Sequence, residues 1–228
     1  MPMSRGSRSP EPSIRNRSMR ILLDENPCEI TAGTVGEAIA IAAEAAEKAG
    51  RLVVEVRVDG AMLTDEELQT AARLEDPAEE VHMLTTTMET LLRDTFLQAS
   101  ETLAAAEREQ QAAAEAMQGG RAAEGMASLM QSLEGWSGIR DAVVQGLSLA
   151  EIPTEDVEFE GIRLADAIVD LQKRLGLLKD AMVAEDVSAT CDCLLYELPA
   201  STTAWRTLLD GLHRRFDAAS GDAGDSNS

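Results

Sequence analysis

Residues 54–68 read VEVRVDGAMLTDEEL, and this stretch decides the fold of the N-terminal part of the chain. Its valines alternate with polar residues, which is typical of a half-buried strand. Asp59-Gly60 is a turn signal, and a short strand is expected directly after it. Thr64 and Glu67 then have the spacing of a capping box, in which each residue satisfies the other's backbone N–H at a helix start. The stretch predicts a strand, a tight turn, a second strand and a helix in close succession.

The residues upstream of this stretch predict two more strands and a longer helix. MRILLDENPCEI, residues 19–30, is typical of strand, turn and strand, with Ile30 near its end. A second capping box joins Thr34 to Glu37, and the helix that it opens is expected to end at Gly50. Strand 51–58 follows, and its alternation predicts an inner face of Leu52, Val54, Val56 and Val58.

Downstream, the helix that begins after Thr64 is expected to run through Ala72, and EVHMLTT, residues 80–86, is expected to form the last strand. Val81 and Met83 point inward in this strand, so His82 is expected to point toward water. The predicted order over residues 19–87 is β-β-α-β-β-α-β. This order resembles the β-grasp, or ubiquitin-like, fold. A ubiquitin-like modifier or sulfur carrier needs a free Gly-Gly end after the last strand, and Thr87 instead continues into a helix.

Residues 88–217 carry helical patterns and no strand signal. Four segments are expected, 88–117, 121–149, 155–185 and 186–217, with a break at Gly119-Gly120, a kink between Gly135 and Gly138, and an interruption at Pro199. Short connections between helices of this kind predict an antiparallel bundle. The third segment contains a heptad pattern formed by Leu164, Ile168, Leu171, Leu175, Leu178 and Met182. The fold class is therefore α+β, a ubiquitin-like domain followed by an antiparallel helical bundle.

Both ends of the chain are expected to be disordered, because residues 1–18 and 218–228 have almost no apolar content. The first segment is rich in Arg, Ser and Pro, and translation could instead start at Met19. No apolar stretch follows the N-terminal arginines, so a secretory signal is not expected. The cytoplasm is the expected location.

The charge of the chain narrows the class of partner. The sequence has 20 Lys and Arg residues against 41 Asp and Glu residues, a formal net charge of -21. Phosphate groups are bound through Lys and Arg, so nucleic acids and anionic membranes are not expected partners. No apolar run approaches the length of a membrane span. The sequence favours a protein partner, either basic or helical.

The residues that could carry chemistry do not form a recognisable catalytic or metal site. Cys191 and Cys193 lie two residues apart, and a zinc site needs about four ligands. We expect one cysteine in the core, the other at its edge, and no metal or other cofactor. His213 is expected near the end of the last helix, with no nucleophile motif to accompany it. The acidic run Glu155, Asp156, Glu158 and Glu160 is expected in the first turn of the third helix.

The stretch DCLLYELPASTTAW, residues 192–205, is the most distinctive part of the helical region. It resembles a D-x-L-E-Y-E-L-x-P…W pattern of bacterial proteins that have a β-grasp-like start followed by acidic helices. Cys193 and Leu195 depart from that pattern, and the proline falls one residue early. The resemblance implies no activity. Tyr196 and Trp205 are interpreted as core anchors across the proline; the alternative is a docking surface formed by Asp192, Tyr196, Glu197, Pro199 and Trp205.

The sequence therefore predicts a non-enzymatic interaction protein, a scaffold or a chaperone-like holder, that acts through an acidic helical surface and a β-grasp domain. The ten methionines suit a surface that repacks around apolar segments. A homo-oligomer that pairs through the 164–182 heptad is one alternative. An enzyme of a type not recognisable from sequence is the other.

Overall fold

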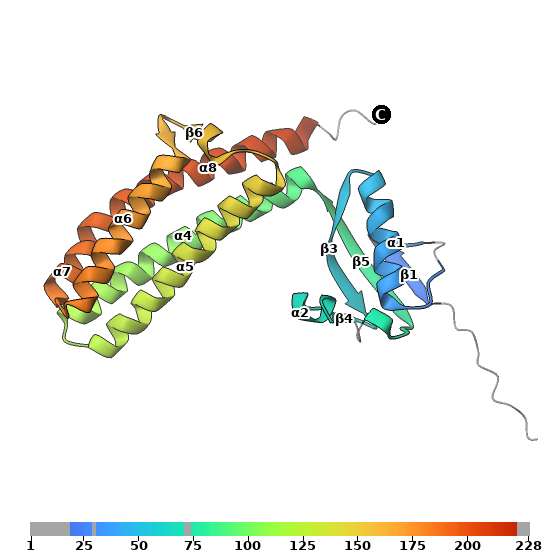
Figure 1. Ribbon diagram of the computed structural model, residues 1–228, viewed down its shortest axis with the longest axis horizontal. Helices are drawn as coiled ribbons and strands as arrows, with labels where there is room; N and C mark the ends of the chain where they lie inside the picture. Colours follow the sequence, from blue (N-terminus) through green and yellow to red (C-terminus); the bar gives the residue numbers. More distant parts are fainter. Residues whose placement is uncertain (1–18, 29–30, 71–73, 223–228) are drawn as a thin grey trace, which may run out of the picture. The chain divides into compact units, whose positions relative to one another are not determined.

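The computed structural model describes residues 19–28, 31–70 and 74–222. The predictions made for residues 1–18, Ile30, Ala72 and residues 223–228 lie outside these ranges. The chain divides between Thr87 and Met88 into two compact units, each with its own hydrophobic core. The first is an α+β unit that contains the sheet, and the second is helical (Figure 1).

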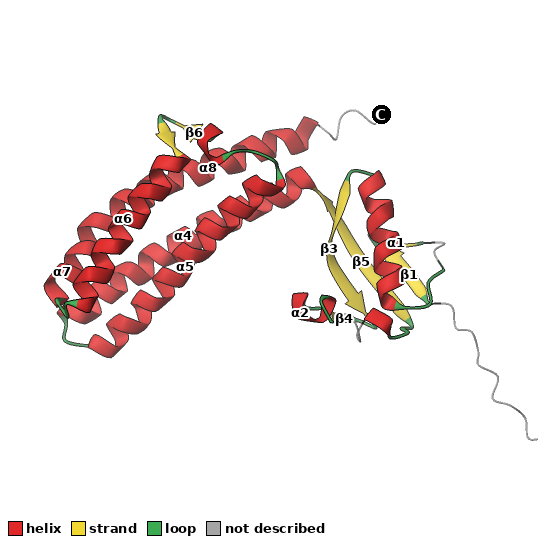
Figure 2. Ribbon diagram, in the orientation of Figure 1, coloured by secondary structure: helices red, strands yellow, loops and turns green. Residues whose placement is uncertain are grey.

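The sheet unit contains a mixed five-stranded sheet in the order β2-β1-β5-β3-β4. The strands are Arg20–Leu23 (β1), Asn26–Pro27 (β2), Arg51–Val58 (β3), Ala61–Met62 (β4) and Glu80–Thr87 (β5). The central pair, β1 and β5, is parallel, and the other pairs are antiparallel. Helix α1, Val35–Lys48, lies across one face of the sheet, as Figure 2 shows. The core between them includes Ile21, Ala38, Ala42, Val81 and Met83.

The helix ends follow the predicted capping chemistry. Thr34 Oγ1 accepts a hydrogen bond from the Glu37 backbone N–H at 3.2 Å, but the Glu37 carboxylate accepts from Gly33 N–H, at 2.7 Å, rather than from Thr34. The second box is reciprocal: Thr64 N–H donates to the Glu67 carboxylate at 2.9 Å, and Glu67 N–H donates to Thr64 Oγ1 at 3.3 Å. These bonds satisfy N–H groups that a helix start leaves without an intrahelical partner.

The helix after Thr64 is shorter than predicted. Helix α2 covers only Asp65–Leu68. Thr70 Oγ1 donates to the Glu66 carbonyl at 2.9 Å, and Thr70 N–H donates to the Glu67 carbonyl at 3.0 Å. A threonine side chain that bonds to the preceding turn competes with regular helix geometry, which accounts for the early end.

The predicted inner face of β3 is wrong in its N-terminal half. The register of β3 against β5 shifts between Val53 and Glu55, so Val54 is the extra residue of a β-bulge. Val53 packs against the core, and Val54 is 48% exposed. Val56 and Val58 point inward, as predicted. One inserted residue moves the alternation by one position and exchanges the two faces.

The helical unit is built from four long helices and a small hairpin. The long helices are Met88–Gln118 (α4), Ala122–Leu149 (α5), Leu164–Val183 (α6) and Leu198–Asp222 (α8). Between α5 and α6 lie a 3₁₀ turn, Thr154–Asp156 (η1), and the hairpin of β6, Glu158–Phe159, with β7, Ile162–Arg163. Between α6 and α8 lie helix α7, Val187–Asp192, and a π-helical segment, Cys193–Glu197 (η2). No helix in the described ranges is long and apolar enough to cross a membrane.

Several predicted boundaries in this unit need correction. The acidic run lies in η1 and the hairpin, and α6 begins only at Leu164. The interruption predicted at Pro199 takes the form of the π-helical segment Cys193–Glu197 just before it, and the helical backbone itself is continuous from α7 into α8. Helix α8 also continues past residue 217 to Asp222. Helix α5 is continuous through Gly135 and Gly138, where the sequence predicted a kink.

Small residues allow α4 and α5 to pack closely against each other. The chain reverses at Gly120, whose φ of 73° is a conformation that glycine adopts without strain. A Cβ atom on Gly135 would lie 3.0 Å from the Ala106 Cβ, and one on Gly146 would lie 3.1 Å from the Phe96 ring. Helix α4 also packs along α8, and α8 packs against α6. Within the described residues the backbones of α5 and α6 have few close contacts, whereas α4 packs closely on both α5 and α8.

The heptad residues of α6 pack within the chain's own bundle. Leu164, Leu171 and Leu178 are at most 4% exposed and belong to the core of the helical unit. Ile168, Leu175 and Met182 are partly buried at the edge of the same core. Three of the six heptad residues are therefore buried in the bundle of one chain, and the other three lie at its edge.

Candidate functional site

The two aromatic residues of the 192–205 stretch do not share a surface. Trp205 is fully buried and meets Trp136 of α5 edge to face, with ring centroids 6.0 Å apart. Tyr196 is 72% exposed. The interpretation as a core anchor is thus correct for Trp205 and wrong for Tyr196. The two side chains do not lie on one exposed surface, because the Trp205 side chain is buried and Tyr196 is exposed.

Glu197, another residue of the expected docking surface, is engaged within the bundle. Arg174 of α6 donates to the Glu197 carboxylate and to the Glu197 carbonyl, both at 2.7 Å, and to the Asp170 carboxylate at 2.7 Å. Ser201 donates to the same Asp170 oxygen at 2.9 Å. The hydrogen bond from Arg174 lowers the pKa of Asp170, although partial burial opposes it. These bonds tie α6 to the start of α8, while Asp192 is exposed and Pro199 is half-buried.

Both cysteines of the Cys191/Cys193 pair are buried, and the expectation that one would lie at the core edge is wrong. Helix α7 packs against both α4 and α6, so it buries more than one stripe of side chains. Cys191 Sγ lies 3.8 Å from the Ala114 carbonyl. Burial raises the pKa of both thiols, and nearby acidic residues add to the effect. Thiols of this kind stay protonated and react slowly.

The histidines lie in different environments, and neither contacts a nucleophile in the described part of the chain. His82 lies between Leu22 and Arg57 across the sheet, on the face opposite α1, and its Nε2 is buried without a hydrogen-bond partner. The expectation that it points to water is therefore only partly correct. His213 Nδ1 lies 3.2 Å from the Arg93 carbonyl of α4. His213 is also well before the end of α8 at Asp222.

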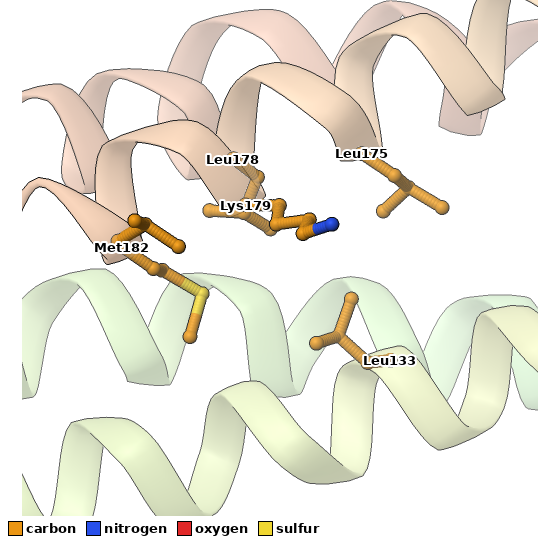
Figure 3. Close-up of a pocket in the computed structure, with 6 residues that line it drawn as sticks. Leu133, Leu175, Leu178, Lys179 and Met182 are labelled. Atoms are coloured by element: carbon orange, nitrogen blue, oxygen red, sulfur yellow. The ribbon is translucent and has the colours of Figure 1, made fainter.

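The helical unit contains an apolar hollow between α5 and α6. Its volume is about 410 Å³, and it is lined by Leu133 of α5 and by Leu175, Leu178, Lys179, Met182 and Val183 of α6. Figure 3 shows Leu133 on one helix facing Leu175 and Met182 on the other, with the Lys179 chain between the helices. Five of these six side chains are aliphatic or thioether groups, so the hollow suits an apolar occupant.

A second hollow continues the first along the same pair of helices. Its volume is about 240 Å³, and Leu133 and Leu175 line it as well as the first hollow. Trp136 and Trp205 also line it, together with Ser137, Arg140, Ile168, Leu171 and Gln172. The indole Nε1 atoms of both tryptophans are buried without a hydrogen-bond partner. We call the two hollows together the α5/α6 groove.

The residues around the groove extend its apolar character. Met126 and Met130, 43% and 51% exposed, precede Leu133 at helical spacing on α5. Val183, at 76%, is the most exposed of the large apolar residues that line the groove. The charged residues that line it are Lys179 and Arg140, and no carboxylate does so in the described part of the chain. The chain as a whole has a net charge of -21, whereas the charged side chains that line this groove are cationic.

The sequence identified Leu175 and Met182 only as positions of the heptad pattern, and sequence reasoning did not find the groove. The available signal was the width of the apolar pattern on α5. Leu129, Trp136 and Val143 already supply a stripe that faces the core, and Met126, Met130 and Leu133 form a second one. A second stripe needs a second partner, and no other helix of the described unit covers it fully.

No known protein family matches this chain, and neither the curated proteins nor the solved structures contain a match to it.

Proposed function

We propose that this protein is a non-enzymatic interaction protein, a scaffold or a chaperone-like holder, that binds an apolar helical segment of a partner protein in the α5/α6 groove. The observation that carries this proposal is the pair of adjoining hollows of about 410 and 240 Å³ between two helices of one bundle. Amphipathic helices bind in grooves of this type through apolar side chains on one face. Exposed methionines beside the groove can repack around different partners.

The surroundings of the groove support binding rather than catalysis. The groove contains no histidine, cysteine or carboxylate among its lining residues, so it has no group ready to act as a base or nucleophile near neutral pH. Within the described ranges, no three His, Cys, Asp or Glu side chains gather as metal ligands would. The buried thiols are protonated, because their pKa values are raised.

We also propose that the sheet unit is a ubiquitin-like β-grasp domain, related to the bacterial proteins that the 192–205 stretch resembles. Support comes from the strand order β2-β1-β5-β3-β4, from the parallel central pair β1 and β5, and from the single long helix across one face. The face opposite α1 carries Leu22, His82 and Arg57 side by side. In this proposal that face is a second contact surface of a cytoplasmic scaffold.

The test compares two variants on one helix. Leu175 lines both hollows, while Leu177 of the same helix is 45% exposed and lines neither. Full-length protein and the variants Leu175→Gln and Leu177→Gln serve as baits in native extract, after circular dichroism has established that both are folded. The proposal expects a stoichiometric partner that wild type and Leu177→Gln retain and Leu175→Gln loses.

A partner that survives in Leu175→Gln would move the binding surface away from the groove. The absence of any stoichiometric partner would count against the scaffold function itself. The oligomeric alternative has its own readout in the same samples, since a mass that rises with protein concentration would indicate self-association.

A further inference from the structure

The two hollows of the groove have a spacing that an α-helix can match. On α6, Ile168 to Leu175 line the hollow at the tryptophans, and Leu175 to Val183 line the other. The centres of these two sets are about eight residues apart, or roughly 12 Å at a helical rise of about 1.5 Å per residue. Since Leu133 and Leu175 line both, the two hollows adjoin and lie within reach of one ligand helix.

A helix lying along this groove would place apolar side chains in both hollows only at certain spacings. Residues seven apart lie about 10.5 Å apart along the axis and within about 20° of the same face. Residues five or six apart point to other faces and cannot fill both hollows together. The geometry therefore selects anchors at positions i and i+7, with a small or apolar residue at i+3 or i+4 above Leu133 and Leu175.

The charges at the groove select the polar flank of the partner helix. Lys179 lines the first hollow and has no ion-pair partner among the described residues. Arg140 lines the second, and its carboxylate partner is the adjacent Asp141, at 2.7 Å, with both side chains about half exposed. A ligand carboxylate can thus reach a cation at each end of the groove without displacing a buried pair.

We infer that the α5/α6 groove takes one amphipathic helix with apolar anchors at i and i+7 and with acidic residues flanking them. This inference rests on the proposed function and specifies its partner. If a second copy of the chain occupied the groove instead, the mass in solution would rise with protein concentration. The acidic flank is unexpected for so acidic a protein, and this makes the inference sharply testable.

The test is a selection from a display library of helical peptides of about 20 residues, long enough to form a helix. The anchor and flank positions are randomised on an alanine-rich scaffold. Immobilised full-length protein is the bait at about 0.15 M salt, where charges more than about 8 Å apart are largely screened. Leu175→Gln, Leu177→Gln and Lys179→Glu are parallel baits, each tested for folding by circular dichroism.

We expect wild type and Leu177→Gln to enrich peptides with apolar residues at i and i+7 and with Asp or Glu beside them. Leu175→Gln is expected to enrich none of these. The Lys179→Glu bait is expected to enrich peptides with basic instead of acidic residues at one flank. In a selected peptide, replacing the acidic flank residue next to Lys179 by Lys is expected to weaken binding to the wild-type protein. The expected loss is roughly twofold to fivefold, as for an exposed ion pair.

The outcomes separate this inference from the proposed function. Peptides that depend on Leu175 but carry basic flanks would overturn the acidic-partner inference and leave the groove as a helix-binding site. Peptides that depend on Leu175 with no i, i+7 pattern would overturn the helical occupant. If no enriched peptide depends on Leu175, the α5/α6 groove is not a peptide-binding site. Both this inference and the proposal that the groove binds a partner's helical segment then fail.

Discussion

The indole rings of Trp136 and Trp205 meet edge to face, with centroids 6.0 Å apart and ring planes at 79°. They join α5 to α8, and both side chains also line the second hollow of the groove. The pair therefore links the stability of the helical unit to the shape of its candidate site, because the same side chains do both.

Trp205→Ala is expected to destabilise the helical unit by about 3–5 kcal/mol, the usual cost of removing a large buried aromatic side chain. Chemical denaturation followed by circular dichroism measures this loss. Tyr196→Ala is the control, and a change of about 0.5 kcal/mol or less is expected because Tyr196 is 72% exposed. Equal losses in the two variants would contradict the different burial of these residues.

Asp24→Asn is expected to lower the stability of the sheet unit at neutral pH. The Asp24 carboxylate accepts hydrogen bonds from Thr85 N–H at 2.7 Å and Thr85 Oγ1 at 2.6 Å, and Arg51 lies 3.3 Å away. Partial burial raises the pKa of Asp24, but the bonds from Thr85 and the charge of Arg51 outweigh it, so the net pKa is lowered from 3.8. A lowered folded-state pKa stabilises the fold above the unfolded-state pKa.

The same contribution is lost as the pH falls through the lowered pKa of Asp24. Wild type should therefore exceed Asp24→Asn in stability near pH 7, and the difference should shrink below about pH 4. Denaturation at a series of pH values measures it, with Asp192→Asn as the control at an exposed carboxylate. A stability difference that grows toward acid pH would show that the pKa of Asp24 is raised, not lowered, in the folded protein.

Gly211→Ala is expected to displace the β6–β7 hairpin. A Cβ atom at Gly211 of α8 would fall inside the van der Waals surface of the Phe159 ring, which lies directly on the helix backbone. Overpacking of this kind costs about 1–3 kcal/mol. The matched change is Gly176→Ala in α6, where a Cβ atom meets nothing within 4 Å. Thermal unfolding should show a loss for the first and a gain of up to about 1 kcal/mol for the second.

Cys191 and Cys193 are expected to resist alkylation in the native protein. They are 4% and 8% exposed, and burial raises the pKa of each thiol. Thiol titration before and after unfolding measures their accessibility, and the half-buried Cys28 is the internal comparison. Rapid modification of two thiols in the native state, located by peptide mass mapping to residues 191 and 193, would contradict their burial.

The features that the sequence predicted well depend on neighbouring residues. Thr34 and Thr64 cap the helices that follow them, Gly50 ends α1, and Gly120 reverses the chain between α4 and α5. Each rests on a side chain or a φ angle within a few residues, so one stretch of sequence is enough to reveal it. The inward positions of Val81 and Met83 follow in the same way from the two-residue period of a strand.

The features that the sequence did not predict depend on contacts between distant segments. The bulge at Val54 depends on the pairing between β3 and β5. Residues 158–163 form a hairpin whose Phe159 packs on Gly211, far along the chain. The same holds for the 192–205 stretch, where similar local patterns place Trp205 in the core and Tyr196 at the surface.

The sequence by itself determined the order of the strands and helices up to Thr87, the helix caps and the four long helical segments, because these follow from local backbone chemistry and periodicity. Only the tertiary structure decided which stripes are covered. Gly135 and Gly146 let α5 approach α4 closely, and the side of α5 that carries Leu133 then faces α6 across a groove. Whether an apolar stripe becomes core or binding surface depends on the distance between helices, which no single helix encodes.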